Sequence, residues 1–348
     1  MKKSILIVFW ILIPVFLISS IYTTSPDKKK LINKEIPVIE FEKNSISICS
    51  FNIQFLGQSN TRDNNVLATI LKDFDIVVVQ ELIVPPFTGK FPDGSNFKPD
   101  EQAAEFFNKM INDGFEFKLS PEDTGPGTEN HNNSSTTEWW VVFFRPDKVI
   151  IANDLPTEFL ENDRTNNEYY DRVPYAFAFR TINEGLDFVL ISVHLRPGSK
   201  SADKSRRKEE LNTITDWIND HDGIEKDFII LGDMNIEDFD ELRDATPGGF
   251  KSLNDECRST NTNVNSPKPY DHVIFRSRYT NEIDSKFDFR VFNLIEAMRS
   301  YWNSDEPYPG GSVNPIGSPE YDHDRFRKYY SDHHPVVFKM NIPDEDDD

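Results

Sequence analysis

Between positions 45 and 340 the chain alternates short runs of β-branched and aromatic residues with polar segments, a pattern that predicts strands. We expect strands at 45–53, 75–81, 115–119, 138–144, 174–180, 187–195, 227–231, 272–275 and 335–340. Apolar residues at helical spacing predict helices at 65–72, 102–111 and 202–219, with Leu211, Ile214 and Ile218 on one face of the last. Segments 121–137 and 301–330 are expected to be long loops. Many strands with few helices predict an α/β fold in which two sheets pack face to face, with helices outside.

The first 22 residues have a different pattern. Lys2 and Lys3 precede an apolar run from Ile5 to Ile18, which Ile21 and Tyr22 extend. This is typical of a signal peptide or of an uncleaved membrane anchor, since the run approaches the ~20 residues that span a bilayer. We therefore expect an exported protein: extracellular, periplasmic or anchored facing outward. Residues 23–44 would be a linker, 45–341 one domain and 342–348 an acidic tail.

Composition adds one constraint. The chain has 38 basic and 59 acidic residues, a net charge of −21, and 37% hydrophobic residues, enough for a large core. Such a surface repels nucleic acid at long range. A protein of this charge that acts on nucleic acid needs local attraction at its site.

Several predicted strands begin or end in polar residues. Asp233 and Asn235 follow an apolar strand two positions apart, hence on the same side of an extended chain. Glu81 and His194 end two other apolar strands. Further polar strand ends are Asn52, Asp271 and the segment 331–335. Each alone is typical of a turn or of a satisfied core residue, but together they indicate one cleft, because burying ionisable groups is costly.

The residue types at these ends suit phosphodiester hydrolysis. Glu81, Asp332 and Asn52 offer only oxygen ligands, which favour Mg²⁺, with Mn²⁺ or Ca²⁺ as substitutes, over zinc. Cleavage of a phosphodiester needs an activated water and a proton for the leaving group. Two histidines, each oriented by a carboxylate, could provide the base and the acid.

Eight motifs occur in a fixed order: Phe51-Asn52-Ile53, Gln80-Glu81, Glu138–Val149, Arg172-Val173-Pro174, His194, Gly232–Asn235, Tyr270–His272 and Ser331–Pro335. In this combination the chain resembles the endonuclease/exonuclease/phosphatase superfamily, and within it the deoxyribonuclease I-like branch. The resemblance extends from Ser50 to Val337. It implies a four-layer α/β/β/α sandwich of two mostly antiparallel sheets and a metal-dependent hydrolase.

The resemblance also implies a metal and phosphate site. Glu81 would be the principal metal ligand, with Asn52 and Asp332 beside it. Water and phosphate would be positioned by Asp233, Asn235 and Arg172.

Two histidine pairs are implied as well. His333, oriented by Asp271, would activate water, and His194, paired with Glu138, would stabilise or protonate the leaving oxygen. The sequence does not determine which histidine is base and which is acid.

Some positions depart from the DNA-cutting relatives. Ile83 stands where they have an arginine that enters the minor groove, and Thr136 where they have a tyrosine. These changes weaken the case for double-stranded DNA. The cluster Arg325, Arg327, Lys328, Tyr329 and Tyr330 could replace that contact through charge and stacking, or could simply cover the edge of the sheet.

The leading hypothesis is an exported endonuclease that degrades DNA or RNA. The same chemistry could instead act on lipid head groups or small phosphate esters, because the fold does not select the substrate. A non-catalytic binding module would have lost Glu81, His194, Asp233 or His333, and all four are present. No obligate protein partner is evident from the sequence.

Overall fold

The computed structural model describes residues 44–58, 61–91, 94–125, 137–164, 167–183, 185–284, 287, 289–311 and 320–346. The expected signal or anchor at 1–22 lies outside these residues, as do all of the expected linker but Asn44, the position Thr136 and the last two residues of the acidic tail. Over the described ranges, no helix is long and apolar enough to cross a membrane.

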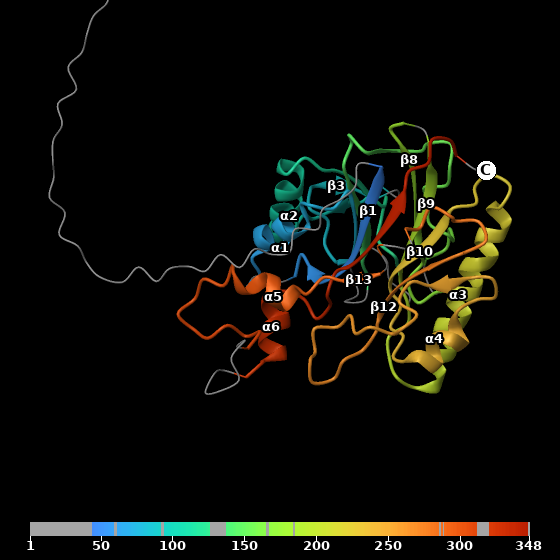
Figure 1. Cartoon of the computed structure of the whole chain (residues 1–348). Helices are drawn as coiled ribbons and strands as arrows, with labels where there is room; N and C mark the ends of the chain where they lie inside the picture. Colours follow the sequence, from blue (N-terminus) through green and yellow to red (C-terminus); the bar gives the residue numbers. More distant parts are fainter. Residues whose placement is uncertain are drawn as a thin grey trace, which may run out of the picture. The chain divides into compact units, whose positions relative to one another are not determined.

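Two six-stranded sheets form the centre of the body (Figure 1). The strands of the first sheet, from edge to edge, are β13 (Arg290–Val291), β14 (Val336–Asn341), β1 (Ser45–Leu56), β2 (Ile76–Leu82), β6 (Trp139–Phe144) and β5 (Glu116–Leu119). Those of the second are β11 (Lys251–Ser252), β12 (Asp271–Phe275), β10 (Phe228–Asp233), β9 (Asp187–His194), β8 (Tyr175–Thr181) and β7 (Val149–Ile151). A small separate hairpin pairs β3 (Gly89–Lys90) with β4 (Asn96–Phe97).

Each large sheet has one parallel pair at its centre and antiparallel pairs on both sides of it. The parallel pairs are β1 with β2 and β9 with β10. Strands paired in parallel place their carboxyl ends at the same edge of the sheet. The expected pair of mostly antiparallel sheets is confirmed. In each sheet, the central parallel pair brings the carboxyl ends of two strands to the same edge.

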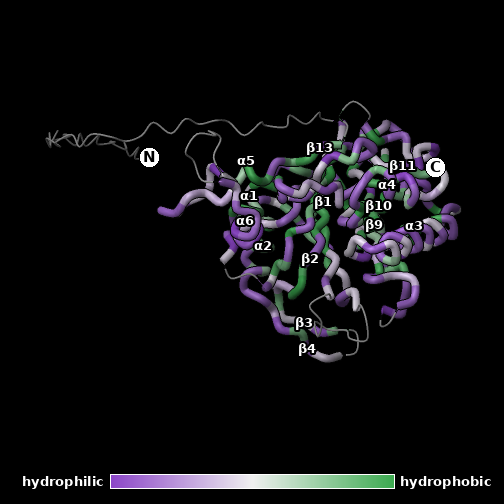
Figure 2. Tube along the Cα trace, turned by 90° about the horizontal axis from the view of Figure 1, so that it is seen from below, coloured by the Kyte–Doolittle hydropathy of each residue, from purple (hydrophilic) through white to green (hydrophobic). Residues whose placement is uncertain are grey.

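Helices cover the outer face of both sheets, which completes the expected four layers (Figure 1). The first sheet packs against α1 (Asn64–Leu71), α2 (Glu101–Asn112), α5 (Leu294–Arg299) and α6 (His323–Tyr329). The second packs against α3 (Ser201–His221) and α4 (Phe239–Ala245). In Figure 2 the hydrophobic segments lie mainly in the strands, with the more hydrophilic helices outside.

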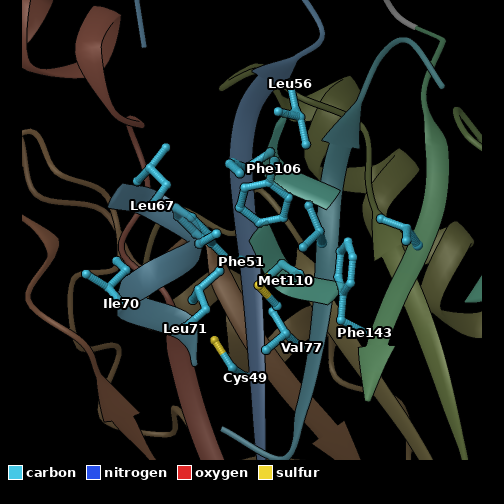
Figure 3. Packing of buried hydrophobic residues seen from close by; sticks show 14 of the residues in the cluster. Cys49, Phe51, Leu56, Leu67, Ile70, Leu71, Val77, Phe106, Met110 and Phe143 are labelled. Atoms are coloured by element: carbon cyan, nitrogen blue, oxygen red, sulfur yellow. The ribbon is translucent and has the colours of Figure 1, made fainter. Parts of the chain in front are cut away.

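Apolar side chains fill three separate cores. Figure 3 shows the core under α1 and α2, where Phe51 of β1 lies among Leu67 of α1 and Phe106 and Met110 of α2. A second core lies between the sheets and includes Ile48, Trp140, Phe177 and Leu231. A third lies between the second sheet and α3. Because β1 contributes to two cores, it is buried on both faces almost throughout.

The nine predicted strands and three predicted helices are all present, with ends that differ by at most three residues. The prediction of an uninterrupted loop over 301–330 is wrong, because α6 forms within it. Asp322 caps this helix by accepting a hydrogen bond from the Arg325 amide. Its buried Phe326 anchors it on the core. Most of the expected loop at 121–137 lies outside the described residues.

Candidate active site

The site lies where the central strands of the two sheets end side by side. β1 and β2 bring Asn52 and Glu81, while β9 and β10 bring His194 and Asp233. Asn52 Nδ2 donates a hydrogen bond to Asp233 Oδ2 at 3.0 Å and so links the two sheets. Four residues that are far apart in the sequence therefore meet at one point.

A local distortion turns Glu81 toward this point. Alternation along β2 would place Glu81 on the same face as Val79, opposite Gln80. Glu81 instead has a left-handed φ of 63°, at a break in the register between Val79 and Leu82. Its Oε1 accepts from Asn52 Nδ2 at 3.0 Å, and its Oε2 accepts from the Phe55 amide at 3.0 Å. Each oxygen of this carboxylate thus has a donor.

Backbone strain is concentrated here. The five described non-glycine residues with positive φ are Gln54, Phe55, Glu81, Asn235 and Cys257. All but Cys257 adjoin the site. Left-handed backbone is costly for such residues and persists where the surrounding structure enforces it, which is common at functional sites.

One glycine allows the central strands of the second sheet to meet next to the site. Gly232 precedes Asp233 and has φ of 142°. A Cβ at this position would lie 2.1 Å from the carbonyl oxygen of Val193, the residue before His194. Only glycine permits this approach.

In the first histidine–carboxylate pair, Glu138 contacts three other residues of the site. Its Oε1 lies 2.9 Å from His194 Nδ1 and 2.9 Å from Arg172 Nε. Its Oε2 accepts the Glu81 amide at 2.6 Å, which connects this pair to the expected metal ligand. His194 Nε2 points to Asp233 Oδ2, at 3.5 Å.

The second pair mirrors the first. His333 Nδ1 lies 2.8 Å from Asp271 Oδ2, and His333 Nε2 lies 3.4 Å from Asp233 Oδ2. Both histidines are buried, and the Nε2 atoms of both face the same oxygen, Asp233 Oδ2. An imidazole whose Nδ1 faces a carboxylate is held in the tautomer that leaves Nε2 free to exchange a proton.

The neighbouring carboxylates favour the charged form of both histidines. Burial lowers the pKa of His333, but Asp271 and Asp233 outweigh it and hold the pKa well above its usual value. Burial and Arg172 lower the pKa of His194, and Glu138 and Asp233 outweigh them. The opposite holds for Asp233: burial raises its pKa, and the two histidines bring it below its usual value.

Asn235 and Ser331 fix the surrounding backbone. The Asn235 amide donates to Asp233 Oδ1 at 2.9 Å, and its side chain donates to the Leu195 carbonyl at 3.2 Å. The Ser331 hydroxyl donates to the Asn52 carbonyl at 2.8 Å and accepts the His333 amide at 3.0 Å. The segment that carries His333 is thereby tied to the end of β1.

The expected ligands Glu81, Asn52 and Asp332 fit a hard cation. Burial raises the pKa of Glu81, and the carboxylates of Asp332 and Glu138 raise it further against the opposing charge of His194. Asp332 Oδ1 is buried and has no hydrogen-bond partner within the described structure. Clustered carboxylates that destabilise one another's charge are stabilised by a cation. Within the described residues, no group of three His, Cys, Asp or Glu side chains is arranged to hold a metal. The expected ligand set does not require such a group, because it consists of two carboxylates, Glu81 and Asp332, and the amide of Asn52.

The structure shows the surroundings of Ile83 and of the cluster at 325–330, two of the features discussed above in relation to DNA binding. Ile83 is buried and cannot reach into a groove. In α6, Arg325 pairs with Glu306 and Arg327 pairs with Asp324. Tyr330 packs in the core under the first sheet. Arg325, Arg327 and Tyr330 therefore have partners within the protein, and whether the cluster also contacts a substrate stays a prediction.

Sequence reasoning missed three contributors to the site. Arg62 is buried between β1 and α1 and donates to two backbone carbonyls at the end of β1. The Phe55 amide binds Glu81. Glu210 of α3 accepts the amides of Asp171 and Arg196, which flank Arg172 and His194. None of the three belongs to the eight motifs, so nothing in the sequence marked them as parts of the site.

A family model for the endonuclease/exonuclease/phosphatase family matches residues 49–333. The chain belongs to this family. The superfamily consists of phosphodiesterases and phosphatases, and its enzymes generally depend on a divalent metal. Membership therefore supports hydrolysis as the class of reaction. No functionally curated protein matches the chain.

Solved structures share the fold. A family protein from Bacteroides thetaiotaomicron is 16% identical, with a TM-score of 0.51 over 85% of this chain and 94% of that one. TDP2 from D. rerio, complexed with a single strand DNA product, is 14% identical (TM-score 0.48; 85% and 99%). A B. thetaiotaomicron mannosyl-6-phosphatase is 15% identical (TM-score 0.49; 84% and 98%). The likeness to the first of these structures shows the fold alone, and with the two packed sheets described above the expected deoxyribonuclease I-like sandwich is confirmed.

Proposed function

We propose that this member of the family is a metal-dependent phosphodiesterase that cleaves nucleic acid. One observation supports the proposal: His194 and His333, each with Nδ1 within 2.9 Å of a buried carboxylate oxygen, present their Nε2 atoms to the same oxygen of Asp233. Two imidazoles that share one acceptor can act on the two sides of a phosphorus centre.

The residues support a division of labour. His333, held by Asp271, would take a proton from the attacking water at Nε2, and His194, held by Glu138, would give its Nε2 proton to the leaving oxygen. Asp233 lies between them and favours the charged form of either imidazole. A divalent cation held by Glu81, Asn52 and Asp332 would neutralise charge on the phosphate when bound.

The charge of the site favours a diester over a monoester. Arg172 forms an ion pair with Glu138, one of the carboxylates of the site. Within the described residues, no lysine forms an ion pair with the carboxylates of the site, which are Glu81, Glu138, Asp233, Asp271 and Asp332. A phosphodiester carries one negative charge, and a monoester close to two at neutral pH. Among the described residues, Arg172 is the arginine that contacts these carboxylates directly, since Arg62 reaches Glu81 only through a peptide group, and a singly charged diester needs fewer such contacts than a monoester.

An aromatic side chain beside the expected metal site supports a nucleic-acid substrate. The Phe55 amide binds the Glu81 carboxylate, and the side chain of Phe55 is 43% exposed. A base adjacent to a phosphate at Glu81 could stack on this ring, and such stacking does not depend on sequence. Local stacking would offset the repulsion from the net charge of −21.

We also propose that the protein is exported, which rests on Lys2, Lys3 and the apolar run that follows them. An exported nuclease would act on DNA or RNA outside the cytoplasm.

The test is to incubate the full chain with supercoiled plasmid or single-stranded RNA and Mg²⁺, beside His333→Ala. Cleavage of either polymer that is lost in the variant and in EDTA is the expected result. If neither polymer is cut but bis(p-nitrophenyl) phosphate is hydrolysed, the nucleic-acid assignment is wrong and a lipid head group or small ester takes its place.

A further inference from the structure

A buried arginine stands directly behind the expected metal ligand. Arg62 lies in the connection between β1 and α1 and is 7% exposed. Its Nη1 donates to the Ile53 carbonyl at 2.6 Å, and its Nη2 donates to the Gln54 carbonyl. Burial lowers the pKa of Arg62 to about 10, and the carboxylates of Glu81 and Asp332 oppose this. The guanidinium is therefore charged at neutral pH.

The Gln54 carbonyl and the Phe55 amide belong to the same peptide group. The carbonyl accepts from Arg62, and the N–H, on the opposite side of the trans peptide, donates to Glu81 Oε2 at 3.0 Å. One peptide group thus connects the guanidinium to the carboxylate. A hydrogen bond at one end of a peptide group polarises it and strengthens the hydrogen bond at the other end.

This peptide group would not hold its orientation unaided. Gln54 and Phe55 both have φ of 55°, and two successive non-glycine residues in left-handed backbone are unfavourable. The charge-assisted hydrogen bonds of Arg62 to the carbonyls of Ile53 and Gln54 offset this cost. Without them, the chain is free to return to extended backbone, which turns the Phe55 amide away from Glu81.

We propose that Arg62 is a positioning residue for the metal ligand Glu81, acting through the peptide group between Gln54 and Phe55. The inference rests on the proposed function, in which Glu81 holds the cation. In this role Arg62 would contact neither substrate nor metal, because its guanidinium is bound to the carbonyls of Ile53 and Gln54. It sets the orientation of the carboxylate, so the quantity that depends on it is the affinity of the protein for the ion.

The alternative is that Arg62 only stabilises the fold, and the chain offers a matched control. Arg145 follows β6, at the opposite end of that strand from Glu138, and its guanidinium likewise donates to two backbone carbonyls, those of Asp113 and Lys72. Arg145→Met removes an equivalent structural tie away from the site. It should lower the melting temperature and leave metal affinity within twofold of wild type.

The experiment titrates the full-length protein with Mn²⁺ and measures free Mn²⁺ by electron paramagnetic resonance, without substrate. We expect Arg62→Met to weaken Mn²⁺ binding at least tenfold. Arg62→Lys keeps the charge but not the planar fork that spans two carbonyls, so it should weaken binding at least threefold. Arg62→Lys also serves as the measurement if Arg62→Met does not fold.

The possible results distinguish a role of Arg62 in positioning Glu81 from a role in stability alone. Wild-type affinity in Arg62→Lys, or tighter binding in Arg62→Met, would mean that Arg62 acts only as a nearby positive charge and would overturn the inference. An equal loss of affinity in Arg145→Met would reduce Arg62 to a stability effect. If the wild-type protein binds no Mn²⁺, the metal-centred proposed function fails, and the role of Arg62 fails with it.

Discussion

Asn52 donates from its side-chain amide to Asp233 Oδ2 at 3.0 Å, which joins the central strands of the two sheets at the site. The same amide donates to Glu81 Oε1 at 3.0 Å. Both neighbours are carboxylates, so a neutral donor between them satisfies two buried acceptors without adding charge. A carboxylate at position 52 would do the reverse.

Asn52→Asp should therefore destabilise the metal-free protein. It replaces two hydrogen bonds with like-charge contacts in a buried cluster, a change that costs about 2–4 kcal/mol. Urea unfolding in EDTA measures this difference, and Mn²⁺ should recover part of it. Asn212→Asp, on the exposed face of α3, is the control and should lie within about 0.5 kcal/mol of wild type. Equal stability of the Asn52 variant and wild type would contradict the position of Asn52 between the two carboxyl groups.

Asp271→Asn tests how His333 is oriented. The amide keeps the size of the side chain but loses the charge that fixes the Nδ1–H tautomer, so we expect kcat/KM to fall by roughly 10²–10⁴. The charge of Asp271 also raises the pKa of His333. Without it the pKa falls, the neutral imidazole persists to lower pH, and the acidic limb of the pH profile should move to lower pH.

His221→Ala, a histidine on α3 outside the site, is the matched control for this measurement and should behave as wild type. An acidic limb that does not move in Asp271→Asn would mean that His333 is not the group whose ionisation limits the rate.

Glu210 should contribute to the pH dependence of stability. Burial raises its pKa from 4.5 to about 7, against the amides of Arg196 and Asp171. The folded state therefore holds this proton more tightly than the unfolded chain does. The resulting stabilisation is complete below pH 4.5 and is lost as the pH rises through about 7, a change of up to about 3 kcal/mol.

Glu210→Gln should flatten the dependence of the free energy of unfolding on pH between 5 and 7.5. Urea unfolding at several pH values measures this, with the exposed neighbour Glu209→Gln as control. If the two variants give parallel curves, the raised pKa of Glu210 is wrong.

Gly232→Ala should prevent the central strands from meeting. The added Cβ would approach the Val193 carbonyl to 2.1 Å, and the backbone of a parallel pair cannot move away without breaking its ladder. We expect a loss of more than about 4 kcal/mol or no folded protein. Gly248→Ala, where a Cβ meets no atom within 4 Å, is the control in circular dichroism and thermal melting.

The sequence predicted the layers because both sheets follow from apolar periodicity, and it predicted that the polar strand ends gather because burying ionisable groups separately is costly. Asn52, His194, Asp233 and His333 meet as expected. It could not predict how Glu81 reaches them, because its left-handed backbone breaks the alternation on which strand prediction depends.

Other features were hidden for physical reasons. Arg62 carries no motif, and its role depends on a peptide orientation that exists only in three dimensions. Helix α6 was missed because its seven residues contain one buried apolar side chain, Phe326, which is too few to show a helical period.

The proposed function is hydrolysis of phosphodiesters by His194, His333 and a bound cation. The most direct measurement is hydrolysis of bis(p-nitrophenyl) phosphate by the full chain with Mg²⁺ or Mn²⁺, with EDTA, and in His333→Ala. We predict turnover that needs the cation, falls by several orders of magnitude in the variant, and exceeds that on the monoester p-nitrophenyl phosphate. Turnover that survives exhaustive chelation would rule out the role of the cation, and turnover that is unchanged in His333→Ala would rule out the role of this histidine.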